Sequence, residues 1–433
     1  MYHPLQEKIA LRTLRVAVVG LGYVGLPLAI TFAEAGFHVT GIDVDQQKIE
    51  RASRAESYIP DISSGALQAL IDAERLHFTS DYAVLGDIDA VSICVPTPLR
   101  KTHDPDISYI ISVTQQVKAH LHPHQLVVLE STTYPGTTDE VLLPELESTG
   151  LTVGTDFFLA FSPERIDPGN PNFDTRSTPK IVGGITPTCT ELALAYYGAA
   201  VEKVIPVSSP RVAEMTKLLE NTFRAVNIGL VNEIAIICEK LSIDVWEVVD
   251  AAATKPFGFM RFLPGPGLGG HCIPVDPHYL SWKLKTLDYT ARFIELAAEI
   301  NSGMPYHVVN KISEALNEQR RSFNGATVLV LGVAYKPNVG DVRESPALDI
   351  IQELLARKAV VLYNDEYVPS LTVRNYTLHS EPVSSGLLQA ADCVVIVTNH
   401  SYYDAPWIVR EARSIVDTRN MTQGCNDQKI FRL

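Results

Sequence analysis

Cys272 has the most distinctive chemical setting in the chain, because it lies in the glycine- and proline-rich segment PGPGLGGHCIPVD at 264–276. His271 precedes it and Asp276 follows four positions later. Glycines let a backbone approach a ligand closely, and a cysteine thiolate attacks carbonyl carbon. Since a small buried thiol needs no such loop, the setting favours a nucleophile at this position. The ordinary buried role is expected instead for Cys94, Cys238 and Cys393.

Four polar residues upstream of this loop share one face of a predicted helix. Helical spacing within 210–228 brings together Glu214, Lys217, Asn221 and Arg224. Such a stripe is usually the solvated side of an amphipathic helix. Asparagine, however, is a poor helix-interior residue, and a cation and an amide one turn apart can hold an oxyanion or activate a water. Both interpretations remain open.

A G-x-G-x-x-G turn is the second candidate site, and it consists of Gly20, Leu21, Gly22, Tyr23, Val24 and Gly25. The first glycine permits a tight turn, the second admits a pyrophosphate, and the third lets the helix pack on the strand. Asp43 lies 18 positions beyond the last glycine, where a carboxylate can bond ribose hydroxyls and repel a 2′-phosphate. The pattern predicts a dinucleotide site that prefers NAD to NADP.

Two loops after strand-like runs could belong to the same site. Thr97 lies in VPTP at 95–98, and Thr132 lies in ESTTYPGT at 130–137. Ligands of α/β sheets bind at this edge. Turn chemistry alone also explains Ser, Thr, Pro and Gly in these places.

The elements that must position these residues follow a clear pattern. Strand-like runs separated by helix-length segments predict a parallel doubly wound sheet, and they occur at 15–20, 38–45, 89–95, 126–130 and 157–161. A smaller set repeats the pattern after a helical stretch, with strands at 325–332, 359–365 and 392–398 and a helix at 346–358.

Between these two sets, apolar residues recur at helical spacing over 210–241 and 289–320, with the Gly/Pro-rich segment 256–277 interrupting them. We therefore predict an α/β protein in which two Rossmann-like doubly wound parallel-sheet domains are joined by a helical middle domain. The expected boundaries are 1–205, 206–322 and 323–433.

The composition narrows the class of protein. The 433 residues carry a formal net charge of −14, which argues against a nucleic-acid or anionic-membrane partner. Six scattered cysteines without a CxxC pair predict neither a zinc cluster nor a disulfide framework. We see no membrane-spanning run and no signal-peptide pattern, so a cytoplasmic protein is expected.

Together the motifs resemble the UDP-glucose/GDP-mannose dehydrogenase family over nearly the whole chain. The matching segments are GLGYVGLPLA at 20–29, ESTTYPGTT at 130–138, FSPER at 161–165, EMTKLLENTFRAVNI at 214–228, PGPGLGGHCIPVDP at 264–277 and GVAYKPNVGDVRESPAL at 332–348. The resemblance implies an NAD-binding first domain, a central domain with the cysteine loop, and a UDP-sugar-binding third domain. It also implies a homodimer or a higher homo-oligomer.

The resemblance implies a four-electron oxidation of a sugar C6 alcohol to a carboxylate, through a thiohemiacetal and a thioester on Cys272. Lys217 and Asn221 would stabilise oxyanions, and Thr132, Glu164 and Asp276 would position or deprotonate water or the C6 hydroxyl. The glycine turn, Asp43, Thr97, Thr132 and Arg343 would bind NAD. The implied substrate contacts are Glu164, Arg165, Arg211, Lys217, Asn221, Arg224, Phe262, Gly267, His271 and Lys336.

His271 and Val275 depart from the GGSC and KD pattern of the family's UDP-glucose branch. They resemble the branch that oxidises UDP-N-acetylhexosamines, with UDP-N-acetylglucosamine expected first, followed by UDP-N-acetylmannosamine and UDP-glucose. Two other classes stay open, a two-electron dehydrogenase of the 6-phosphogluconate type that needs no thiol and a regulatory NAD sensor without catalysis.

Overall fold

A computed structural model describes residues 4–59, 62–100, 104–167 and 172–433. The chain divides into two compact units. The first comprises Met1–Glu220 with His278–Tyr289, and the second comprises Asn221–Pro277 with Thr290–Leu433. Within the described residues, no helix is both long and apolar enough to cross a membrane.

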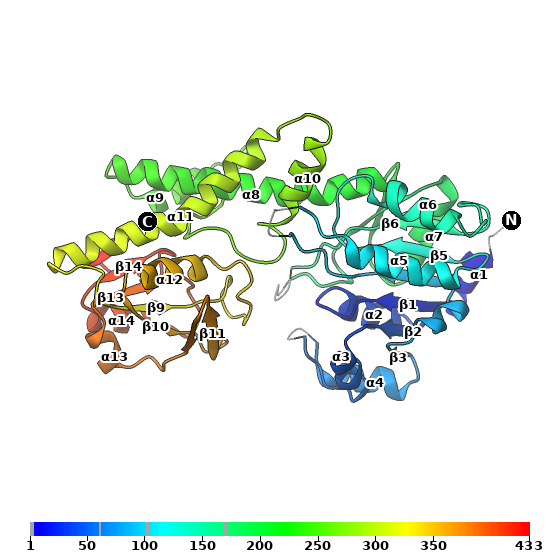
Figure 1. The fold of residues 1–433 in the computed structure, drawn as a ribbon, viewed down its shortest axis with the longest axis horizontal. Coiled ribbons are helices and arrows are strands. Elements are labelled where there is room, and N and C mark those ends of the chain that lie inside the picture. The colour runs from blue at the N-terminus through cyan, green and yellow to red at the C-terminus, as the bar shows by residue number, and fades with distance from the viewer. Residues whose placement is uncertain (1–3, 60–61, 101–103, 168–171) are drawn as a thin grey trace. The chain divides into compact units, whose positions relative to one another are not determined.

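The first unit is built on an eight-stranded sheet with the order β3-β2-β1-β4-β5-β6-β7-β8 (Figure 1). All neighbouring strands pair in parallel except β6 with β7. The order reverses between β1 and β4, which is where such sheets bind ligands. The strands are β1 (Arg15–Val19), β2 (His38–Ile42), β3 (Leu76–Thr79), β4 (Ala90–Ile93), β5 (Leu126–Leu129), β6 (Phe158–Phe161), β7 (Lys180–Gly184) and β8 (Val204–Pro206).

Helices cover both faces of this sheet because its strands are apolar on both sides. Val16 and Val18 pack in one core with α2 and α7, while Ala17 and Val19 pack in the other with α5. The helices of this part of the chain are α1 (Pro4–Ala10), α2 (Gly25–Glu34), α3 (Gln46–Ser53), α4 (Ser64–Asp72), η1 (Tyr82–Asp87), α5 (Ser108–His120), η2 (Thr138–Leu142), α6 (Leu143–Glu147) and α7 (Pro187–Gly198).

The second sheet has the order β10-β9-β13-β14-β15, and all its strands are parallel. Val328 and Val330 face the core shared with α11 and α12, and Leu329 and Leu331 face the core shared with α13 and α14. Its elements are β9 (Thr327–Leu331), α12 (Pro346–Ala356), β10 (Val360–Asn364), α13 (Ser385–Ala390), β13 (Cys393–Ile396), α14 (Ala405–Glu411), β14 (Ile415–Asp417) and β15 (Ile430–Arg432). A separate hairpin pairs β11 (Ser370–Val373) with β12 (Tyr376–His379).

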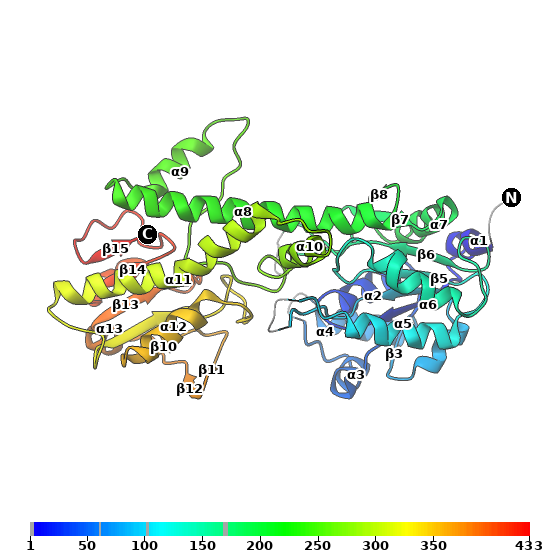
Figure 2. The same cartoon turned by 45° about the horizontal axis from the view of Figure 1, so that its top comes forward.

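Between the sheets the chain is helical, in agreement with the predicted middle region. Two long helices lie side by side in both ribbon views, α8 (Pro210–Lys240) and α11 (Arg292–Glu318) (Figures 1 and 2). Two shorter helices are α9 (Val245–Ala253) and α10 (Asp276–Lys285). The fold class is confirmed, and the segment expected to be irregular stays irregular until α10 begins.

Candidate active site

The glycine turn has the backbone that the motif requires. Gly20 has φ +92°, and a Cβ there would lie 2.5 Å from the carbonyl oxygen of Cys94. A Cβ on Gly25 would lie 1.8 Å from the oxygen of Gly20, whereas at Gly22 no atom lies within 4 Å. Helix α2 starts at this turn, and its N-cap Val24 makes no side-chain cap. Its first N–H groups are therefore suited to an anionic pyrophosphate.

Asp43 ties the end of β2 to this turn. One carboxylate oxygen accepts from Leu21 N at 2.8 Å and from Lys48 Nζ at 3.2 Å, and the other accepts from Asp45 N at 2.9 Å. The Asp43 side chain is 7% exposed, while that of Lys48 is 36% exposed. A ribose hydroxyl can therefore compete for a carboxylate whose cationic partner is a surface lysine.

The two threonine loops border the strands at the reversal point. Thr97 follows β4 and is buried, and its carbonyl oxygen accepts a hydrogen bond from the Tyr279 hydroxyl. Thr132 follows β5 and is half-buried. Tyr23, in the glycine turn, is exposed. These loops and the turn thus meet at the carboxyl edge of one sheet, as predicted.

Helix α8 corrects the solvated-stripe interpretation. Glu214, Lys217 and Asn221 are all buried, and Arg224 alone of the four is exposed. Glu214 accepts from Gly136 N at 2.7 Å and from Thr138 N at 2.9 Å, so it fixes the loop that carries Thr132. The sequence placed all four residues on one face of the helix, but in the structure Arg224 is exposed and the other three are buried.

Glu164 and Lys217 form a buried charged pair, with 3.5 Å between Oε2 and Nζ. Ile166 N also donates to Glu164. Burial raises the pKa of the Glu164 carboxyl, and Lys217 opposes that rise. Arg165, next in the chain, donates to Glu220 at 2.7 Å and to the carbonyl oxygen of Pro179 at 2.6 Å.

The cysteine loop holds a thiol unlike most others in the chain. Cys94, Cys189, Cys238 and Cys393 are buried, whereas Cys272 is half-buried. Its Sγ lies 3.7 Å from Nδ1 of the exposed His271. The Cys272 carbonyl accepts from Asp276 N at 2.8 Å, and the buried Asp276 carboxylate accepts from Asn221 Nδ2 at 2.5 Å.

Buried amides hold the start of this loop. Gly265 N donates to Asn232 Oδ1 at 2.9 Å, Asn232 Nδ2 donates to Asn301 Oδ1 at 2.9 Å, and Asn301 Nδ2 donates to the Ala225 oxygen at 3.1 Å. Gly270 N donates to the carbonyl oxygen of Arg343 at 3.0 Å. The N–H groups of Gly265 and Gly270 are thus already hydrogen-bonded within the protein.

Other predicted substrate residues of this loop region have definite places. Gly267 has φ +134° and approaches the Asn301 oxygen and the Pro346 ring, so a side chain there would be strained. Phe262 packs edge-on against Phe223 with 5.8 Å between ring centroids.

Several predicted cations already have acidic partners. Arg211 is exposed and donates to Asp139 at 2.7 Å and Glu140 at 2.8 Å. Arg343 is exposed and donates to Asp341 at 2.6 Å. Lys336 is half-buried in the loop after β9. Arg211 and Arg343 therefore offer a ligand less net positive charge than their residue type suggested.

Sequence reasoning missed Arg419, which follows β14 in the segment IVDTRN. A Cβ on Gly265 would lie 2.6 Å from its Nη1, and its Nε donates to the Val397 oxygen at 2.9 Å. Burial lowers its pKa to about 10, so it stays cationic at neutral pH. A cation two positions after the end of a buried strand was the signal available in the sequence.

The second sheet repeats the carboxylate of the first, but with a different environment. Asp365 follows β10 as Asp43 follows β2, and one of its oxygens accepts from Val333 N at 2.9 Å and Ala334 N at 3.0 Å. His400 Nε2 lies 2.9 Å from the same oxygen, and neither side chain is exposed.

A glycine turn at the reversal point of a doubly wound sheet, with an acid ending the second strand, defines a dinucleotide-dependent dehydrogenase domain. Family models match the chain in three parts, described as the NAD binding domain (14–201), the central domain (211–303) and the UDP binding domain (329–424). The chain belongs to the UDP-glucose/GDP-mannose dehydrogenase family. It is an NAD-dependent oxidoreductase that acts on a CH–OH group of a UDP-sugar.

Named relatives differ in their sugar. UDP-N-acetyl-D-glucosamine 6-dehydrogenase of Pseudomonas aeruginosa is 35% identical over 91% of this chain and 92% of that protein. NDP-N-acetyl-D-galactosaminuronic acid dehydrogenase of Ralstonia solanacearum is 33% identical over 94% and 96%. A solved structure of the UDP-D-ManNAc dehydrogenase from Pyrococcus horikoshii superimposes with a TM-score of 0.88 at 33% identity, over 97% and 98% of the two chains.

Proposed function

We propose that this protein oxidises the C6 alcohol of a UDP-N-acetylhexosamine to the uronic acid through a covalent adduct on Cys272. The observation that carries the proposal is the thiol itself. It is half-buried and lies beside His271, while four other cysteines are buried. A buried thiol would be shielded from a sugar aldehyde, whereas an accessible thiol beside a polar group can attack one.

The chemistry needs a covalent intermediate because the aldehyde hydrogen leaves readily as hydride only after the carbonyl carbon has become a tetrahedral adduct. NAD, when bound, accepts one hydride in each of the two oxidations. Cys272 adds through sulfur to C6 of the aldehyde and forms a thiohemiacetal. Loss of hydride and a proton from this adduct leaves a thioester, and water then releases the carboxylate and restores the thiol.

The polar groups of α8 and its surroundings would stabilise the developing charges. Lys217 and Asn221 stand one turn apart on the helix, as donors to oxyanions of the adduct. Asn221 is held by Asp276 at 2.5 Å, which supports a fixed orientation of its amide. Glu164, whose pKa burial raises, is the candidate base for the attacking water or the C6 hydroxyl, with Thr132 as a positioning hydroxyl.

We propose that 1–205 binds NAD, that 206–322 carries the cysteine loop, and that 323–433 binds the UDP part of the substrate. Arg419 and Lys336 are the cations of the last region that we assign to the diphosphate. The half-buried Arg419 side chain approaches Gly265 of the cysteine loop, which supports this assignment. A charged hydrogen bond in a buried place discriminates strongly for an anion.

For the sugar, we propose UDP-N-acetylglucosamine first, with UDP-N-acetylmannosamine as the next candidate. The support is His271 before the cysteine and Val275 before the aspartate, together with the names of the relatives. The uronic acid made would serve as a precursor for polysaccharide synthesis.

The test is to incubate the protein with NAD and a panel of UDP-sugars, counting NADH and identifying the acid by mass. Two NADH per sugar are expected. Cys272→Ser should abolish carboxylate formation, because serine lacks the ionisable thiol. Cys425→Ser is the matched control, since Cys425 is also a half-buried thiol.

One NADH per sugar together with an active Cys272→Ser variant would instead indicate a two-electron dehydrogenase. If no UDP-sugar yields NADH, a regulatory NAD-binding role takes its place.

A further inference from the structure

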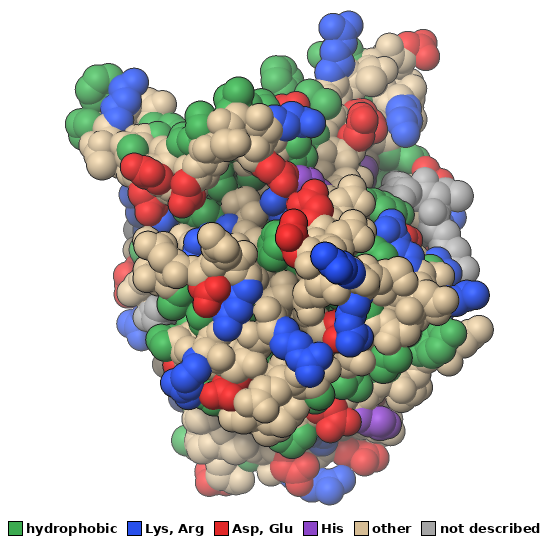
Figure 3. Space-filling model, turned by 90° about the vertical axis from the view of Figure 1, so that its left-hand side faces the viewer, with side chains coloured by type: hydrophobic (Ala, Val, Ile, Leu, Met, Phe, Trp, Pro, Cys, Tyr) green, Lys and Arg blue, Asp and Glu red, His purple; other side chains and the backbone are tan. Residues whose placement is uncertain are grey.

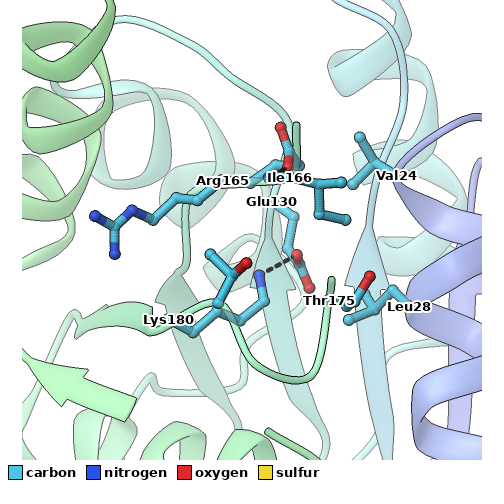
Figure 4. Close-up of a pocket in the computed structure, with 9 residues that line it drawn as sticks. Val24, Leu28, Glu130, Arg165, Ile166, Thr175 and Lys180 are labelled. Carbon is cyan, nitrogen blue, oxygen red and sulfur yellow. Dashed lines mark hydrogen bonds and ion pairs between the residues drawn. The ribbon is translucent and has the colours of Figure 1, made fainter. Parts of the chain in front are cut away.

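Beneath the Glu164 region lies a second buried ion pair, between Glu130 and Lys180. Glu130 directly follows β5, and Lys180 is the first residue of β7. Their side chains are 1% and 8% exposed, and 2.5 Å separates Nζ from Oε2. Figure 4 shows the two side chains pointing toward one another across the sheet edge, with the pair drawn as a dashed line.

Surrounding groups fix this pair in orientation. The Tyr197 hydroxyl donates to Glu130 Oε1 at 2.5 Å, and Lys180 Nζ donates to Ser162 Oγ at 3.3 Å. The ammonium also lies 4.8 Å from the centroid of the Tyr197 ring. Both oxygens of Glu130 thus accept hydrogen bonds, and neither charge can move without breaking one.

The pair shares a small pocket with Glu164. Glu130, Glu164, Arg165 and Lys180 all line it, together with the apolar side chains of Leu28 in α2, Val24 and Ile166 (Figure 4). Besides Arg165, which lines the same pocket, four charged or titratable groups interact electrostatically with Glu164. They are Lys217 of α8, Lys180 of β7, Glu130 after β5 and Cys94 after β4.

Packing alone does not account for two buried charges. Desolvating an ion pair costs free energy that the attraction within the pair often fails to recover, and apolar side chains of similar volume are often as stable or more so. Strand β5 is buried and apolar, and the residues of β7 after Lys180 are buried isoleucine, valine and glycine. The charges are therefore explained better by an effect on a neighbour, and the neighbour in the same pocket is Glu164.

We propose that Lys180 and Glu130 are positioning residues that set the charge state of Glu164 during the reaction, with Lys180 favouring the carboxylate and Glu130 limiting that effect. The inference rests on the proposed role of Glu164 as a base. The electrostatics agree with it. Burial raises the pKa of Glu164, Lys217 and then Lys180 lower it, and Glu130 raises it again.

The test is the pH dependence of kcat/KM for the UDP-sugar, measured by NADH formation at saturating NAD. Glu130→Gln removes a neighbouring negative charge, so the acid limb should move to lower pH by about one unit. Lys180→Met removes the cation, so the limb should move to higher pH, and by more than the Glu130→Gln shift because Lys180 has the larger effect on Glu164. Lys180→Arg keeps the charge and should retain the wild-type limb.

The matched control is Lys311→Met, which breaks another 2.5 Å pair of a lysine whose side chain is 7% exposed, formed with Glu239. It should leave the limb in place even if it lowers the melting temperature. Opposite shifts in the two test variants support the proposal, because a merely structural role lowers activity without moving the limb. Unmoved limbs in folded Glu130→Gln and Lys180→Met variants overturn it.

If a single variant does not fold, the Glu130→Gln/Lys180→Met double variant leaves no charge unpaired. Its limb should lie above that of the wild type, since Lys180 has the larger effect on Glu164; a wild-type limb overturns the proposal. A Glu164→Gln variant distinguishes failure of the proposed base from failure of the positioning role. A retained acid limb in that variant removes Glu164 as the base, whereas a lost limb with unmoved Glu130 and Lys180 variants removes only the positioning role.

Discussion

Single side chains in this protein often have more than one partner, so one substitution affects more than one contact. Asp43 is the clearest case, because one carboxylate holds the glycine turn through Leu21 N and also faces Lys48. Glu214 likewise has backbone partners, since its carboxylate accepts hydrogen bonds from the N–H groups of Gly136 and Thr138. Loss of such a residue therefore affects both a loop and the ligand that the loop binds.

Asp43→Ala should weaken NAD binding and relax the discrimination against NADP. A lost charge-assisted hydrogen bond is worth about 1.5–3 kcal/mol, or roughly 10- to 100-fold in Kd. Dissociation constants for the two dinucleotides, measured by fluorescence titration, provide the check. Asp45→Ala is the control, because Asp45 caps α3 two residues away. Unchanged selectivity in Asp43→Ala would remove this residue from the dinucleotide site.

At the residue scale, the sequence was informative where a residue type conflicts with its setting. Cys272 in a glycine loop and Asn221 inside a helix were both conspicuous in the sequence. In the structure Cys272 is half-buried, and Asn221 donates a hydrogen bond to Asp276. Lys180 was missed because a lysine opening an apolar strand gives no hint of a partner 50 positions away. The acidic partners of Arg211 could not be predicted, since they lie 71 and 72 positions upstream.

Elements were easier to predict than contacts, because hydrophobic periodicity is a local property. The runs expected at 126–130 and 392–398 match β5 (Leu126–Leu129) and β13 (Cys393–Ile396). The sequence did not predict short edge strands such as β8, because Val204–Pro206 has only three residues and ends in proline. Pairing order, including antiparallel β6 with β7, depends on contacts that no local pattern contains.

The helices α8 and α11 fix the cysteine loop through one amide chain, so a change there should act on the loop. Asn232→Ala leaves the buried Gly265 N–H and the Asn301 amide short of a partner. The free energy of unfolding should fall by about 1–3 kcal/mol, and kcat should fall because the loop carries the thiol.

Urea unfolding and steady-state kinetics measure both effects. The control is Asn227→Ala on the same helix, whose amide bonds only to Phe223 O of its own helix in the described contacts. Equal losses in the two variants would contradict a loop-anchoring role for Asn232.

At the scale of the whole molecule, surface chemistry bears on partners. The net charge is −14, and acidic and basic side chains are interspersed over the face in Figure 3. Helix α8 exposes large apolar side chains along its length, namely Met215, Leu219, Phe223, Leu230 and Ile237. Exposed apolar stripes of this kind are typical of protein interfaces, and a second copy of the chain presents the same stripe.

We therefore predict a homodimer formed through α8. Light scattering after gel filtration should give twice the 47.6 kDa of one chain. Leu219→Glu, which places a charge on a side chain that is 58% exposed, should yield a monomer. Leu287→Glu is the control, at a site that is 67% exposed outside the helix. A wild-type monomer, or a dimer that tolerates Leu219→Glu, would rule out this interface.

The buried Asp365–His400 pair has a consequence for how four electrons leave one sugar. Because His400 already occupies the buried carboxylate of Asp365, whereas the cationic partner of Asp43 is the partly exposed Lys48, we expect the second sheet not to bind a dinucleotide. In the described part of the chain the glycine turn is then the one dinucleotide site that we expect, so NADH must leave before the second NAD binds. During that exchange the intermediate aldehyde would dissociate unless it were held in the site. A covalent bond to the Cys272 sulfur would hold it.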